Sequence, residues 1–240
     1  MGGTCRAVSL IFAQGTPGMS IRMEKVNEIP SSPLDVFLLP VWVHKRISVK
    51  LKGLIFAFLF VGIFDFVFHR NLMELGFFQG GAGDLILKSI LGIVASFIIG
   101  AFDVICTMVP IAEFAIMIGN RSEKYVSARL PVILMKSYAL SHLLYVVPVA
   151  FYIYSGIDWT GVDMTSPLKI RVLFSVLYAL LIILPFLQLG VIYRTISIRT
   201  RIQIFGKLIL VMAMYFWMQL SGEAILFVGD SLYAIIEWIK

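Results

Sequence analysis

The sequence predicts an all-α protein, a polytopic transmembrane helix bundle with five spans. Of its 240 residues, 60% are hydrophobic and 14% are charged, and the mean hydropathy is +0.94. Soluble chains are about 45–50% apolar and about 25% charged. The apolar residues also gather in stretches close to the ~20 residues that cross ~30 Å of hydrocarbon. These observations exclude a soluble enzyme, a coiled coil and a disordered chain.

Residues 1–29 are expected to form a disordered tail, because the segment has too little apolar surface to order itself. Its apolar run is short for a signal peptide. Arg6 stands where a myristoylation motif needs Ser or Thr, so no lipid anchor is predicted.

Residues 30–52 are predicted to be an interfacial juxtamembrane segment. Pro30, Pro33 and Pro40 prevent a continuous helix. Trp42 precedes a basic cluster, a combination typical of the headgroup layer. We therefore expect contact with anionic lipid at the cytoplasmic face. The cluster consists of Lys45, Arg46, Lys50 and Lys52.

A transmembrane domain over 53–221 is predicted from five apolar stretches. They cover about 53–69, 85–118, 131–154, 171–193 and 204–220. The first is barely long enough for one crossing. The second would be ~51 Å long as a helix, too long for one crossing. No polar turn divides it, so we expect one helix that projects past the membrane and bends near Pro110.

The charges between these stretches predict the orientation. Segments 1–52, 119–130 and 194–203 are basic, whereas 70–84 and 155–170 are not. Basic loops remain on the cytoplasmic side. The alternation therefore predicts a cytoplasmic N-terminus and an outside C-terminus.

Residues 222–240 are expected to form a separate amphipathic helix on the outer surface. Ser221 and Gly222 offer a place to bend, since glycine weakens a helix. Glu223, Asp230 and Glu237 are spaced by seven and would form one stripe. This stripe is interpreted either as a solvated edge or as a docking ridge for another protein.

Several ionisable residues fall inside apolar stretches. A charge at the bilayer centre costs ~2.5–3.5 kcal/mol, so each should face the bundle or pair with another charge. Glu113 and Lys136 lie near the cytoplasmic ends of adjacent spans, and we predict an ion pair between them. The set is either a structural network or an ion or proton path. Its members are Asp65, Asp103, Glu113, Lys136, His142 and Glu223.

No catalytic or metal-binding motif is recognised. HExxH, GxSxG and P-loop patterns are absent, and the three histidines share no span. We therefore expect no catalysis, no cofactor and no metal site. The net charge of +6 falls in short clusters between spans, which indicates anionic lipid rather than nucleic acid as the partner.

The order of these features resembles the Ypt/Rab-interacting-protein (Yip) domain family, over roughly 30–220. The resemblance rests on an Asp-aromatic-Pro-aromatic segment before the first span, on part of the third span, and on basic loops before the third and after the fourth. The short N-terminal region is similar to prokaryotic members. The residues are Asp35, Phe37, Pro40, Trp42, Lys136, Ser137, Tyr138 and Pro148.

The resemblance implies a non-catalytic integral membrane protein that works through partners, in the cell membrane if the source is prokaryotic. Two functions follow as expectations. The first is a scaffold or partner-binding protein in membrane organisation or trafficking, whose partners are other membrane proteins, small GTPases in the eukaryotic branch. The alternative is a subunit of a transporter or permease that uses Asp65, Asp103, Glu113 and Lys136. A polar cavity lined by Asp103 would favour the transporter, and a dry bundle would favour the scaffold.

Overall fold

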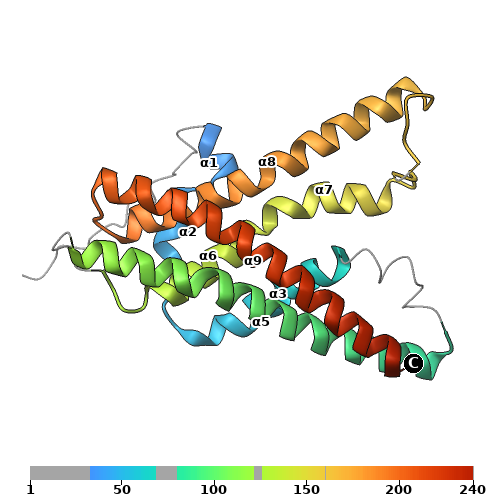
Figure 1. Cartoon of the computed structure of the whole chain (residues 1–240), viewed down its shortest axis with the longest axis horizontal. Coiled ribbons are helices and arrows are strands. Elements are labelled where there is room, and N and C mark those ends of the chain that lie inside the picture. Colours follow the sequence, from blue (N-terminus) through green and yellow to red (C-terminus); the bar gives the residue numbers. More distant parts are fainter. Residues whose placement is uncertain (1–32, 69–79, 122–125, 160, 240) are drawn as a thin grey trace, which may run out of the picture.

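The protein is described here by a computed structural model, which defines residues 33–68, 80–121, 126–159 and 161–239. Every regular element in these ranges is helical, as the sequence predicts (Figure 1). The predicted tail 1–29 lies outside them. The helices are α1 (Pro33–Phe37), α2 (Val41–Arg46), the short 3-10 helix η1 (Leu51–Gly53), α3 (Leu54–Phe68), α5 (Ala82–Arg121), α6 (Leu130–Ser141), α7 (Leu143–Tyr154), α8 (Leu168–Arg199) and α9 (Ile204–Ile239).

Four helical segments of the described chain are long and apolar enough to cross a membrane. They are α5, the α6–α7 pair, α8 and α9. Their outer faces carry large exposed apolar side chains, such as Ile182 and Phe186 on α8 and Phe216 on α9. A multi-pass membrane protein in contact with lipid accounts for these faces.

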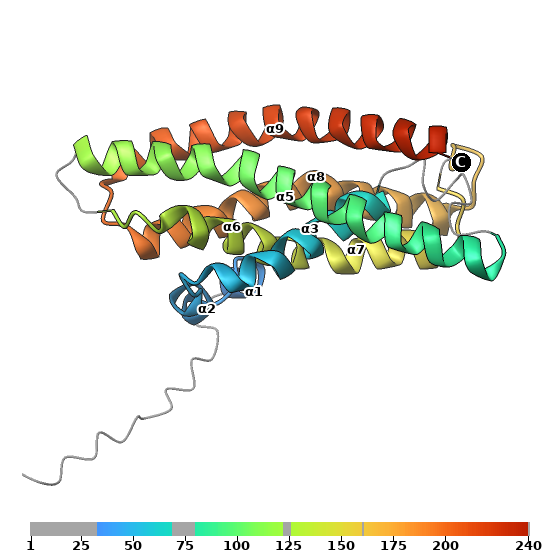
Figure 2. The ribbon, with the colours of Figure 1, turned by 90° about the horizontal axis from the view of Figure 1, so that it is seen from below.

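The helices run roughly along one long axis, and α5 and α9 lie side by side (Figure 2). α5 contacts α3, α6 and α9, and α8 contacts α2, α6, α7 and α9. Most buried apolar residues form one cluster around Met108, Leu134 and Ile192. A smaller cluster contains Phe66, Ala95 and Ile99.

The second apolar stretch forms one helix, α5, which confirms that no turn divides it. Pro110 lies inside this helix without ending it. At 40 residues α5 is ~60 Å long and exceeds the ~30 Å of hydrocarbon. The bend near Pro110 stays a prediction.

The third apolar stretch forms one candidate span over Leu130–Tyr154, as predicted, but its helix is interrupted at His142. α6 ends at Ser141, and α7 begins at Leu143. The Tyr138 carbonyl accepts from Ser141 Oγ at 2.6 Å and from His142 Nδ1 at 2.9 Å. The His142 backbone N–H instead donates to the Ala139 carbonyl, one residue closer than in an α-helix. Pro148, inside α7, cannot donate to the Leu144 carbonyl and crowds it, so this proline and the side chains that bond the Tyr138 carbonyl together account for the break.

The prediction of a separate helix over 222–240 is wrong, because α9 continues from Ile204 to Ile239. Ser221 is buried, and its hydroxyl lies 3.2 Å from the Thr107 hydroxyl of α5. Beyond it, α9 continues to pack on α3 and α5, so tertiary contacts outweigh the weak helix propensity of Gly222. The packed residues are Ile225, Leu232 and Tyr233 against Phe66, Ala95 and Ile99.

The juxtamembrane segment contains two short helices that dock on the bundle. Pro40 precedes α2, and Leu39 has a φ of 61°, so the chain turns sharply between α1 and α2. α2 contacts α8. Trp42 remains 40% exposed, with the Arg46 guanidinium 5.2 Å from its ring centre. Its location in the headgroup layer stays a prediction.

Candidate functional site

Two glycines bring α3 and α5 into backbone contact. A Cβ on Gly62 would lie 1.6 Å from the Ser96 carbonyl oxygen, and one on Gly100 would lie 2.0 Å from that of Phe58. Only glycine fits such a contact, as at other close crossings of membrane helices.

Asp65 and Asp103 each lie about one turn beyond these glycines on helices that run in opposite directions (Figure 2). The Cα–Cβ bonds of a helix tilt toward its N-terminus. Both side chains therefore lean back toward the glycine contact, and toward each other.

Asp103 is held by hydroxyl groups. Asp103 is 2% exposed. The Tyr138 hydroxyl, from α6, donates to it and lies 3.0 Å from both oxygens. The Thr107 hydroxyl donates to Oδ1 at 2.9 Å. These bonds fix the orientation of the Asp103 carboxylate.

His142 completes a group of three at the α6–α7 break. The carbonyl of Tyr138 can only accept, so the proton of a neutral His142 ring resides on Nδ1 and the lone pair on Nε2. Asp65, Asp103 and His142 each offer one ligand atom, and these atoms lie within 4.8 Å of one another.

Asp65 is incompletely satisfied. Its Oδ2 atom is buried and has no hydrogen-bond partner in the described structure. Most buried polar atoms have a partner, so an orphaned carboxylate oxygen calls for an explanation.

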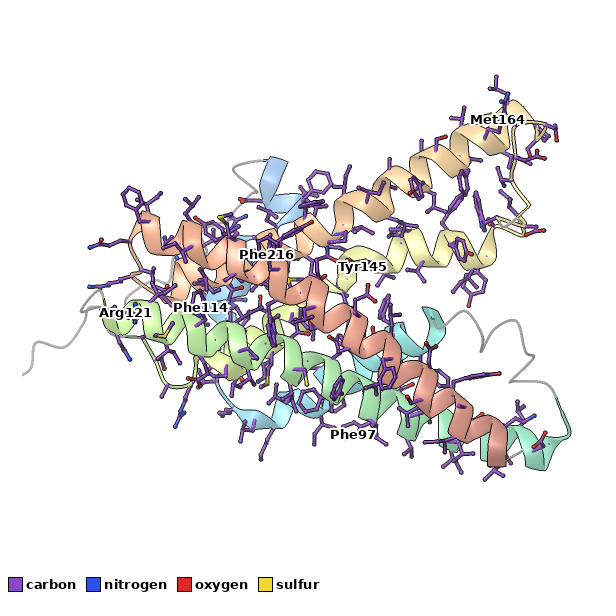
Figure 3. All side chains as sticks on the ribbon, in the orientation of Figure 1. Phe97, Phe114, Arg121, Tyr145, Met164 and Phe216 are labelled. Carbon is purple, nitrogen blue, oxygen red and sulfur yellow. The ribbon has the colours of Figure 1, made fainter. Side chains whose placement is uncertain are left out.

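The three residues face a cavity of about 480 Å³, which we call the central cavity. This volume is within the ~300–1,000 Å³ typical of ligand pockets. Tyr145, near the middle of the molecule in Figure 3, donates to Gln188 at 3.3 Å. The polar lining residues are Asp65, Asp103, Tyr138, His142, Tyr145, Gln188, Gln219 and Glu223.

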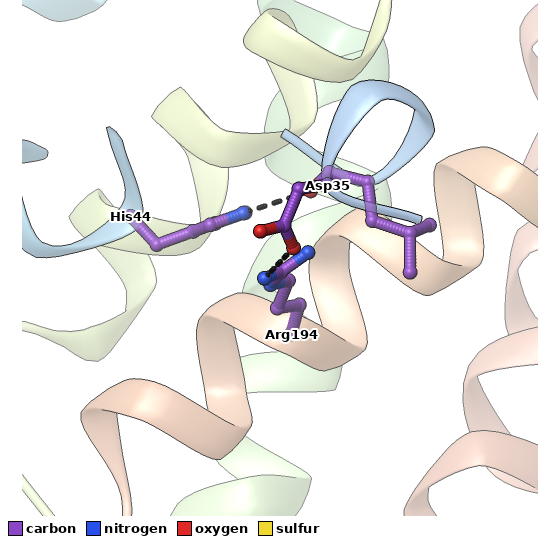
Figure 4. Close-up of polar contacts among 4 residues, drawn as sticks. Asp35, His44 and Arg194 are labelled. Atoms are coloured by element: carbon purple, nitrogen blue, oxygen red, sulfur yellow. Dashed lines mark hydrogen bonds and ion pairs between the residues drawn. The ribbon is translucent and has the colours of Figure 1, made fainter. Parts of the chain in front are cut away.

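A second polar group anchors the N-terminal helices to α8. Arg194 forms an ion pair with Asp35 (Figure 4). His44 is fully buried, and its Nε2 donates to the Leu38 carbonyl at 2.9 Å. Its Nδ1 lies 2.8 Å from the Thr195 hydroxyl. Burial lowers the pKa of His44 below its usual 6.5.

Arg199, at the end of α8, closes this anchor. Its guanidinium donates to the carbonyls of His44, Lys45 and Ile47 at 2.8–3.1 Å. A cation at the carboxyl end of α2 also complements that helix's dipole.

The predicted residues separate into different places. Asp65, Asp103, Tyr138 and Glu223 meet at the central cavity, whereas Asp35, Pro40 and Trp42 belong to the docked N-terminal segment. Asp230 is exposed on α9. Glu237 belongs to the same helix, but its side chain lies outside the described residues.

The predicted ion pair between Glu113 and Lys136 is wrong. Lys136 Nζ donates to the carbonyls of Ser48, at 3.0 Å, and Lys50, at 2.5 Å. Glu113 is exposed on α5. The lysine thus donates to carbonyl groups of the juxtamembrane segment. The positions of residues along their spans do not reveal these partners.

Sequence reasoning missed the cooperation of His142 with the two aspartates, because it looked for several histidines on one span. It also missed Tyr145 and Gln188, which carry no sequence signal. A signal for the aspartates does exist. The same Gly-x-Phe-Asp pattern occurs at 62–65 and at 100–103.

No protein-family model, curated protein or solved structure matches this chain. The resemblance to the Yip domain family therefore rests on the residues quoted for it in the sequence, and function must be argued from the site.

Proposed function

We propose that this protein is a transport protein or transporter subunit that holds a cation at the carboxylates of the central cavity. The observation that carries the proposal is that Asp65 and Asp103, from different helices, converge on a 480 Å³ cavity. A dry bundle, as expected for a scaffold, has no such space.

The charge of the cavity favours a cation. Two carboxylates approach each other there, and no Lys or Arg is among the described lining residues. Carboxylates at membrane depth are expensive unless they are paired or neutralised. A bound cation or proton would supply the missing positive charge.

The proposal includes α3 as a fifth span and a cytoplasmic N-terminus. α3, with 15 residues, reaches only ~22 Å, but it packs along α5 and directs Asp65 into the cavity.

The orientation concerns the two ends of the bundle. Arg121 and Met164 lie at opposite ends of the molecule (Figure 3). The α1–α2 segment docks at Arg199, the basic end of α8, which supports a cytoplasmic N-terminus.

Single cysteines test this orientation in a chain whose own Cys5 and Cys106 are replaced by Ser. Met164→Cys, at an 86% exposed position, should react with an impermeant maleimide from outside intact cells. Ala128→Cys should react only after the membrane is opened. Reaction of Ala128→Cys from outside would overturn the orientation.

Liposomes that contain the purified chain test transport. They are loaded with a pH indicator or a metal indicator, and external H⁺, Na⁺ or Mn²⁺ is added in turn. We expect flux of one cation that Asp103→Asn abolishes. Glu113→Gln, which removes an exposed carboxylate from the same helix, should leave it intact. Absence of flux for every cation, or flux unchanged by Asp103→Asn, would reject the proposal.

A partner-binding function of the Yip type is the second candidate. It is supported by the docked N-terminal segment, which contains the resemblance residues Asp35, Pro40 and Trp42 and leaves Trp42 40% exposed. Loss of a specific co-purifying membrane protein in Trp42→Ala, with the Asp103→Asn complex intact, would favour this candidate.

A further inference from the structure

The two Gly-x-Phe-Asp patterns build one site from opposite directions. Each glycine contributes to the α3–α5 contact, and each aspartate follows about one turn later. The helices run in opposite directions, so the patterns are related by an approximate local two-fold rotation. In transporters built from inverted repeats of several spans, ion sites lie at the repeat interface, and here the same kind of symmetry relates two single helices.

From this geometry we propose that Asp65, Asp103 and His142 bind a divalent transition-metal ion of the Mn²⁺ or Zn²⁺ class. The inference rests on the proposed function, because it names the cation held in the central cavity. Three observations carry it: the three converging ligand atoms, the orphaned oxygen of Asp65 and the free lone pair of His142.

The distances fit a single ion after small side-chain rotations. The three ligand atoms lie within 4.8 Å of one another. Tetrahedral ligands of one Zn²⁺ at ~2.0–2.2 Å stand ~3.3–3.6 Å apart, so the side chains must bring these atoms together by about 1 Å. A rotation of the Asp65 side chain would let Oδ2 bind the metal ion, which would then be the partner that this oxygen lacks.

The tautomer of His142 is the one that metal sites use. A ligating histidine almost always donates its other N–H to a carbonyl or carboxylate, which fixes the ring. Here Nδ1 donates to the Tyr138 carbonyl and leaves Nε2 for an ion. The α6–α7 break is therefore what orients the third ligand.

Asp103 has the supporting bonds that a ligand requires. The Tyr138 and Thr107 hydroxyls hold its carboxylate. Tyr138 thus supports two ligands, Asp103 through its hydroxyl and His142 through its carbonyl. Such outer partners typically change metal affinity by ~10–100-fold when removed.

The ligand set selects the kind of ion. Mg²⁺ and Ca²⁺ prefer oxygen ligands alone, whereas imidazole suits transition metals. Two aspartates neutralise the charge of a divalent ion, which lowers the cost of holding that ion among buried groups. Glu223, exposed on α9 and also lining the cavity, gives an arriving cation a first carboxylate.

Titration calorimetry of the full chain in detergent, stripped with a chelator, tests the inference. We expect one Mn²⁺ or Zn²⁺ per chain and much weaker binding of Mg²⁺. Asp65→Asn, Asp103→Asn and His142→Gln should each weaken binding by at least ~100-fold, more than an outer partner does. Tyr138→Phe should weaken it by ~10–100-fold. Glu113→Gln is the matched control and should bind normally.

Gel filtration would reveal ligand variants that fail to fold. A spectroscopic measurement on the unmodified chain keeps the inference testable in that case. Co²⁺ added to the unmodified chain should give visible absorption bands typical of bound nitrogen and oxygen ligands. Zn²⁺ should displace them. Absence of these bands, equal affinity for Mg²⁺, or normal binding by all three ligand variants would overturn the metal site.

The outcomes separate this inference from the proposed function. Proton or Na⁺ flux that Asp103→Asn abolishes, without binding of Mn²⁺, Zn²⁺ or Co²⁺, would reject the metal and keep transport. Metal binding that Asp103→Asn abolishes, without flux of any cation, would reject transport and leave a fixed metal site.

Discussion

Gly62 of α3 and Gly100 of α5 lie in backbone contact, so close that a Cβ on Gly100 would stand 2.5 Å from the Gly62 nitrogen. This pair sets the separation of the two helices. The central cavity therefore depends on the lack of a side chain at both glycines, as well as on the carboxylates that line it.

Gly62→Ala should separate α3 from α5. Its Cβ would overlap a backbone carbonyl, which cannot rotate away, so we expect a loss of ~1–3 kcal/mol, the range of overpacked cores. Thermal unfolding in detergent measures it. Gly83→Ala is the control, because nothing lies within 4 Å of its Cβ. Equal stability of the two variants would contradict the contact.

Gly222→Ala should stabilise the protein. Gly222 lies inside the continuous helix α9, and a Cβ there meets nothing within 4 Å. Alanine is favoured over glycine inside a helix by ~0.5–1 kcal/mol. A lower melting temperature would show instead that the chain needs to bend at this residue.

Asp35→Asn and Arg194→Gln should each destabilise the protein more than the double variant does. The side chains of this pair are 11% and 18% exposed, and removal of one partner leaves the other charge poorly solvated. We expect ~1–3 kcal/mol for each, below the ~3–5 of a fully buried pair. A cycle of unfolding measurements gives the coupling. Glu113→Gln with Lys136→Gln should be additive, because these two do not meet.

His44 should make stability depend on pH. The pKa of His44 is lowered in the folded protein, chiefly by burial, with Arg194 and Arg199 nearby acting in the same direction. The unfolded chain therefore binds the proton more readily. The stability that the neutral His44 contributes is fully present above about pH 6.5. As the pH is lowered from there to the pKa of the folded protein, the free energy of unfolding decreases by at most ~1.4 kcal/mol per pH unit.

The measurement compares unfolding of the unmodified chain and of His44→Gln between pH 8 and pH 5. Other titrating groups are common to both proteins, so the difference isolates His44. The pKa of Asp163 is lowered by hydrogen bonds from Thr165 and Ser166, so its titration falls below this window. Parallel stability curves would contradict the buried neutral histidine.

Local pattern was sufficient for most helices. The apolar stretches at 85–118 and 171–193 lie inside α5 and α8, because apolar length near that of a membrane is a property of consecutive residues. Pro40 separates α1 from α2 as expected, since proline limits the backbone locally.

Local pattern failed where a distant contact decides. Gly222 predicts a bend, but packing on α3 and α5 keeps α9 continuous. The interruption of the 131–154 stretch at His142 is instead local, because Ser141 and His142 bond the Tyr138 carbonyl three and four residues before them. The positions of Lys136 and Glu113 along their spans place them near each other, but Lys136 donates to the carbonyl of Lys50, 86 residues away in the chain.

The sequence by itself determined that this is a multi-pass helical membrane protein with costly acids at Asp65 and Asp103, because composition and helix length are sums over neighbouring residues. Only the tertiary structure decided that those acids meet His142 around one cavity. That meeting depends on how α3, α5 and the α6–α7 break pack, and packing depends on shape complementarity between residues far apart in the chain. Gly62 and Gly100 are the clearest case, since their effect comes from the close approach that each permits the other.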